Sequence, residues 1–174
     1  MAKPSQVSEI ICDVIEQDMT DDLFKHMKET AYNCGYEGKS LALVQAKVNA
    51  SAVEWLKNEF ERHAPSRGAA ADVWRRVMRG VVWTDHVPEL SSETISDEWK
   101  DGRNAKREEI KEDNQAKAIR IIWDLAKDKG DTDEEILDYA LMGCPSLGYS
   151  HAKRELDQAR AYHHPAVENP NAEQ

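Results

Sequence analysis

Apolar residues recur three and four positions apart along most of this chain, and that spacing constrains the fold more than any other feature. In residues 5–17, one helical face would carry Val7, Ile10, Ile11, Val14 and Ile15. Because an α-helix has 3.6 residues per turn, this spacing gathers apolar side chains into one stripe that faces a core. The pattern repeats as far as residue 163. It predicts an all-α fold, a multi-helix bundle.

Capping residues, glycines and prolines divide the pattern into separate helices. Thr20 stands before two acids, and residues 132–135 (TDEE) have the form of a capping box, so both sites indicate a helix start. Ser51 begins a second candidate capping box, and the third helix either restarts there or continues. Gly35 and Gly143 are typical of helix ends. The expected helices are 5–17, 20–35, 40–64, 66–79, 104–129, 132–143 and 146–163.

The bundle could be continuous, or it could form two small helical lobes joined by an acidic linker. Residues 81–102 contain one Lys against six acids, and Pro88 interrupts any helix there. The expected division is an N-terminal helical lobe over 1–80, an acidic linker over 81–103, a C-terminal three-helix lobe over 104–164 and a flexible tail over 165–174. Within the linker, at most one helical turn is expected, around residues 95–99.

Charge and composition limit the classes of protein that this chain can belong to. The formal net charge is −10, which disfavours a generic nucleic-acid coat or a protein of anionic membrane surfaces. No run approaches the roughly 20 apolar residues that span a bilayer, and the first residues do not resemble a secretory signal. Three widely spaced cysteines fit reduced thiols. We therefore expect a cytoplasmic protein without membrane contact.

One basic cluster stands out from the acidic background. Residues 65–80 carry four Arg against one Asp. The candidate binding residues there are Arg67, Trp74, Arg75, Arg76 and Arg79. Arginines bind phosphate or carboxylate groups through paired hydrogen bonds, so the cluster predicts a site for nucleic acid or an acidic partner. The alternative is structural, because cations are also favoured in the last turn of a helix and Trp74 could lie in the core.

No pattern in the sequence indicates an active site. There is no glycine-rich phosphate loop and no nucleophile motif, and the histidines and cysteines lack metal-ligand spacing. We therefore assign no catalytic residues, no metal ligands and no cofactor.

The C-terminal part of the chain resembles a known arrangement of three helices. A helix ending in AIRIIWDLAKDKG is followed by TDEEILDYALMG, the turn CPSLG and the helix YSHAKRELDQARAY. Residues 117–163 thus resemble the tri-helical core of helix-turn-helix and winged-helix proteins. The resemblance implies that the last helix is a recognition helix. Its implied groove-facing residues include Tyr149, His151, Lys153 and Arg154.

Two functions follow as expectations. The first is a non-enzymatic regulatory or accessory protein of nucleic-acid transactions, acting within a nucleoprotein or protein assembly. The second is an acidic interaction protein that binds and inhibits or adapts a nucleic-acid-binding protein by displaying carboxylates as DNA displays phosphates. A protein partner is expected in both, and nucleic-acid contact, either direct or through a complex, in the first. The oligomeric state is left open.

Overall fold

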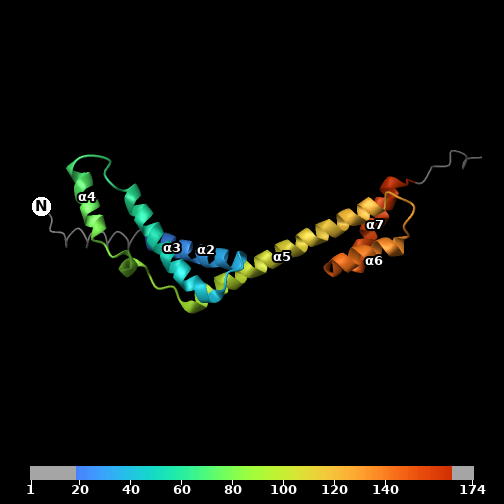
Figure 1. Cartoon of the computed structure of the whole chain (residues 1–174), viewed down its shortest axis with the longest axis horizontal. Helices are drawn as coiled ribbons and strands as arrows, with labels where there is room; N and C mark the ends of the chain where they lie inside the picture. The colour runs from blue at the N-terminus through green and yellow to red at the C-terminus, as the bar shows by residue number, and fades with distance from the viewer. Residues whose placement is uncertain (1–18, 166–174) are drawn as a thin grey trace, which may run out of the picture. The chain divides into compact units, whose positions relative to one another are not determined.

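The structure, a computed structural model, describes residues 19–165 and is all-helical over that range (Figure 1). The α-helices are α2 Thr20–Tyr36, α3 Leu41–Arg62, α4 Ala69–Arg79, α5 Ser92–Leu125, α6 Asp133–Gly143 and α7 Tyr149–His163. Two short 3-10 helices are η2 Trp83–His86 and η3 Pro145–Leu147. The predicted all-α class is confirmed. The helix expected over 5–17 and the tail from 166 onward lie outside the described residues.

The chain divides into two compact units, Met1–Lys106 and Arg107–Gln174, and the division falls inside helix α5. Each unit has its own hydrophobic core. No helix in residues 19–165 is both long enough and apolar enough to cross a membrane.

Helices α2 and α3 form the core of the N-terminal unit and pack against each other (Figure 1). The completely buried side chains are Leu23, Met27 and Ala31 of α2 with Val44, Val48, Ala52 and Leu56 of α3. In both helices these residues are four apart, so each helix buries one narrow stripe. Helix α3 continues through Ser51, whose hydroxyl contacts α2 instead of capping a new helix.

Helices α2 and α5 touch backbone to backbone, and two glycines allow this contact. A Cβ atom on Gly35 would lie 2.0 Å from the carbonyl oxygen of Trp99, and one on Gly102 would lie 2.0 Å from that of Tyr32. Any side chain at either position would force the helices apart. Gly35 is thus a packing residue, and α2 ends one residue beyond it, at Tyr36.

The segment expected as an acidic linker differs from the prediction. Residues 92–103 form the first part of α5, well before the expected start at 104. Leu90 and Ile95 are buried in the N-terminal core, and the Trp99 indole Nε1–H donates to the Lys39 carbonyl oxygen over 2.9 Å. In residues 90–103, three apolar residues and one glycine anchor a segment whose other residues are charged or carry hydroxyl groups. An apolar stripe with so few residues is easily mistaken for a solvent-exposed linker.

The C-terminal unit packs the second part of α5 against α6 and α7. Its largest completely buried side chains are Ile122, Ile136 and Leu156. The capping box is confirmed, because the Thr132 hydroxyl accepts from the Glu135 N–H and the Glu135 carboxylate accepts from the Thr132 N–H over 2.8 Å. The Thr132 N–H and the Thr132 hydroxyl both donate to the Glu135 carboxylate, and these two bonds lower the pKa of Glu135. Helix α5 ends four residues earlier than expected, and η3 occupies part of the segment expected to begin α7.

The glycine contacts generate a stability prediction. Gly102→Ala or Gly35→Ala should lower the free energy of unfolding by about 3 kcal/mol, the upper part of the usual cost of overpacking. Urea unfolding followed by circular dichroism measures this change. Gly143→Ala is the matched control, because a Cβ there meets no atom within 4 Å. The control should be neutral or stabilised by up to about 1 kcal/mol. An unchanged urea midpoint in Gly102→Ala would contradict the backbone contact.

Candidate functional site

Helix α4 has one apolar face and one arginine face. Trp74, Val77 and Met78 pack against the N-terminal core, whereas Arg75, Arg76 and Arg79 are exposed. Gly68, at φ +85°, precedes the helix, and Gly80 caps its end. Ala71 is the one buried residue of α4, so a few half-buried side chains hold the helix in place.

A hollow of about 460 Å³ lies beside α4. It is lined by Lys57, Phe60, Glu61 and Ala64 from α3 and the residues after it, by Trp74, Arg75, Met78 and Arg79 from α4, and by Trp83 from η2. Three of these side chains are cationic and one is acidic. We call this the aromatic hollow.

Three aromatic rings from three elements meet in the aromatic hollow. The ring of Phe60 lies 6.3 Å from that of Trp74 and 5.3 Å from that of Trp83, and both pairs are tilted. These are favourable distances for aromatic pairs. The Trp74 Nε1–H is buried and has no hydrogen-bond partner among the described residues. Phe60 itself is buried, so it joins the hollow to the core.

At the rim of the hollow, Arg75 forms only a weak ion pair with an acidic side chain. Arg75 lies 3.0 Å from Asp72, but both side chains are well exposed, at 65% and 70%. Ion pairs of this kind contribute about 0–1 kcal/mol, so an incoming phosphate or carboxylate can compete with Asp72.

The structure brings three of the five residues of the predicted basic site together in one hollow and places further residues beside them. Trp74, Arg75 and Arg79 line one hollow, whereas Arg67 and Arg76 are exposed but do not line it. Sequence reasoning did not assign the other six lining residues to a site: Lys57, Phe60, Glu61, Ala64, Met78 and Trp83. The signal for three of them was the spacing of residues 57, 60 and 61, which places them on one face at the end of α3.

The predicted recognition helix, α7, presents less positive charge than its sequence indicates. Lys153 lies 2.6 Å from Asp157 and 3.5 Å from Asp133, and the hydrogen bond to Asp157 raises the pKa of Lys153. His151 lies 3.5 Å from Glu155. Tyr149 and Arg154 are exposed. The carboxylates beside Lys153 and His151 weaken this face as a phosphate-binding surface.

Arg160, which the sequence reasoning did not single out, organises the turn between α5 and α6. Its guanidinium donates to the carbonyl oxygens of Ala126, Asp128 and Asp131 over 3.2, 2.6 and 2.7 Å. It also donates to the Asp133 carboxylate over 3.2 Å. The carbonyls that follow the end of a helix lack partners within it, so one side chain satisfies several of them here. Arg160 is therefore a structural residue.

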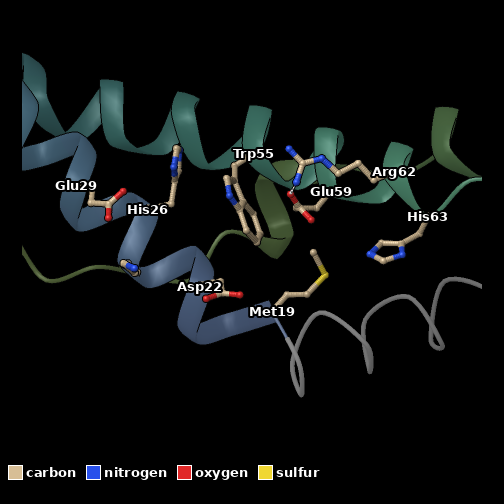
Figure 2. A pocket seen from close by; sticks show the side chains of 9 residues that line it. Met19, Asp22, His26, Glu29, Trp55, Glu59, Arg62 and His63 are labelled. Carbon is tan, nitrogen blue, oxygen red and sulfur yellow. Dashed lines mark hydrogen bonds and ion pairs between the residues drawn. The ribbon is translucent and has the colours of Figure 1, made fainter.

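A second hollow, of about 610 Å³, lies between α2 and α3 (Figure 2). Asp22, Glu29 and Glu59 oppose Lys25 and Arg62 in its lining, so neither sign of charge dominates. The Trp55 ring extends from α3 toward α2 in Figure 2. No group of three metal-ligating side chains is found in residues 19–165.

A His–Ser pair beside this hollow resembles part of a nucleophile site, but its hydrogen bonds oppose that role. His26 Nε2 lies 2.7 Å from Ser51 Oγ, and Ser51 Oγ lies 3.2 Å from Thr30 Oγ1. The Thr30 hydroxyl donates its one proton to the His26 carbonyl oxygen, so Ser51 donates to Thr30 and His26 Nε2–H donates to Ser51. A base must accept the proton of its nucleophile, and His26 donates instead. The pair links α2 to α3.

The Arg160 contacts generate a second stability prediction. Arg160→Leu should lower the free energy of unfolding of the C-terminal unit by about 2–3 kcal/mol, because it removes four charge-assisted hydrogen bonds from one half-buried guanidinium. Arg154→Leu, an exposed position on the same helix, should change it by less than about 0.5 kcal/mol. Chemical denaturation of both variants measures the difference. Equal stabilities would show that Arg160 does not hold the turn.

No family model, curated protein or solved structure matches the chain. The likeness of residues 117–163 to helix-turn-helix cores therefore stays a prediction.

Proposed function

We propose that this chain is a non-enzymatic accessory protein of nucleic-acid transactions that binds nucleic acid through the aromatic hollow. The observation that carries the proposal is the convergence of Lys57, Arg75 and Arg79 around three aromatic rings. Cations next to aromatic side chains supply both kinds of contact that nucleic acids use, to the phosphate and to the base.

The local charge supports this surface. Residues 57–80 contain six basic and three acidic residues, although the whole chain carries a net charge of −10. At physiological salt, charges more than about 8 Å away are largely screened, so a local basic surface can bind phosphate on an acidic protein. The α7 surface is less suited, because Lys153 and His151 already face carboxylates.

Charge reversal at the hollow tests the proposal. Arg75→Glu/Arg79→Glu should weaken binding of a fluorescently labelled oligonucleotide at least about tenfold, measured by anisotropy. Wild-type affinity should fall about 20- to 40-fold between 50 and 200 mM salt if three cations contact phosphates. The matched control is Lys100→Glu/Lys111→Glu, which changes the net charge equally at two exposed positions outside the hollow. Absence of binding by the wild type, or equal loss in both variants, would contradict the proposal.

A different surface favours the second function, an acidic protein that binds a nucleic-acid-binding partner. On α6, Tyr139 is 56% exposed and Met142 is 77% exposed. Acidic residues surround them, namely Glu134, Glu135 and Asp138. A smaller hollow of about 360 Å³ lies beside Tyr139. Exposed apolar side chains within an acidic face suit a partner with basic and apolar side chains.

Removing the exposed apolar side chains tests this second function. Tyr139→Ser/Met142→Ser should abolish nuclease-resistant co-purification of protein partners from the native host, while leaving oligonucleotide binding unchanged. Arg75→Glu/Arg79→Glu should show the reverse pattern if both surfaces operate. Partner retention that is lost on nuclease treatment would argue against this function, because nucleic acid would then bridge the proteins.

A further inference from the structure

We infer that the aromatic hollow binds single-stranded rather than duplex nucleic acid, with an unpaired base against its rings and phosphates at its cationic rim. This inference rests on the proposed function and specifies its ligand. It depends on two features of the hollow: its aromatic lining and the placement of its cations.

The aromatic lining favours an unpaired base. Phe60, Trp74 and Trp83 converge from α3, α4 and η2 with ring separations of 5.3 and 6.3 Å. Met78 and Ala64 add further apolar surface. In a duplex the flat faces of the bases are stacked on one another, and only their edges are accessible. A single strand exposes those faces, which stack on aromatic side chains.

The cations lie where a bound strand would place its phosphates. Arg75 and Arg79 are one helical turn apart on α4, so their side chains leave the helix on the same side. Lys57 approaches the same hollow from α3. All three side chains are exposed. A strand whose base enters the hollow therefore passes between cations supplied by two different helices.

An acidic peptide fits the same hollow less well. A bound peptide must find hydrogen-bond partners for its own N–H groups, and Glu61 is the one acidic side chain in the lining. A nucleobase needs fewer hydrogen-bond partners, and its flat faces stack on the aromatic rings.

The test compares four ligands with the unmodified full-length protein. They are a labelled single strand of about 12 nucleotides, within the usual range of single-strand sites, the corresponding duplex, an abasic strand with the same number of phosphates, and a polyglutamate peptide. The single strand should bind about tenfold more tightly than the duplex and the abasic strand. It should also quench part of the tryptophan fluorescence, because stacked bases lie against Trp74 and Trp83.

A pair of variants assigns the effect to the hollow. Trp83→Leu should lose most of the preference for the single strand, whereas Trp55→Leu, in the hollow between α2 and α3, should retain it. Thermal unfolding checks that both variants fold. If Trp83→Leu does not fold, the comparison of the single strand with the abasic strand decides, since it needs no variant.

The outcomes separate this inference from the proposed function. Equal binding of single strand, duplex and abasic strand, still lost in Arg75→Glu/Arg79→Glu, would overturn the inference and leave the proposed function intact. Polyglutamate binding as tightly as the single strand would overturn the inference in favour of an acidic protein partner. No binding of any oligonucleotide would overturn both.

Discussion

The contact between α2 and α5 is the constraint on which the N-terminal unit depends. Gly35 and Gly102 let two backbones meet without side chains between them, and Trp99 ties the same crossing to the Lys39 carbonyl oxygen. Because α2 also packs along α3, the crossing joins the start of α5 to the N-terminal core. A highly charged segment thereby becomes an integral part of a hydrophobic unit.

The same core reaches the proposed binding site through one residue. Phe60 lies near the end of the buried stripe of α3, and its ring contacts Trp74 and Trp83 in the aromatic hollow. The Phe60 ring is therefore positioned by the packing of α3, whereas Trp74 lies on α4 together with the exposed Arg75 and Arg79.

Residues with strong local patterns could be predicted from the sequence. The buried stripes of α2 and α3 and the capping box at Thr132 follow from spacing and residue type alone. The arginine cluster of α4 was found because its residues are close together in the chain.

Contacts between distant segments could not be predicted. Gly102 has the composition of a linker residue, and nothing local shows that Tyr32 lies against it. The four bonds of Arg160 and the place of Lys57 in the hollow likewise arise only after folding.

The indole N–H signals of the five tryptophans provide the most direct test of the central claim. Trp74 and Trp83 line the aromatic hollow, whereas Trp55, Trp99 and Trp123 lie elsewhere, and the last two donate to Lys39 and Glu155. In a heteronuclear NMR titration with a single-stranded oligonucleotide, the signals of Trp74 and Trp83 should shift, and the other three should stay in place. Shifts confined to Trp123 on the C-terminal unit, or no shift at saturating oligonucleotide, would contradict the account.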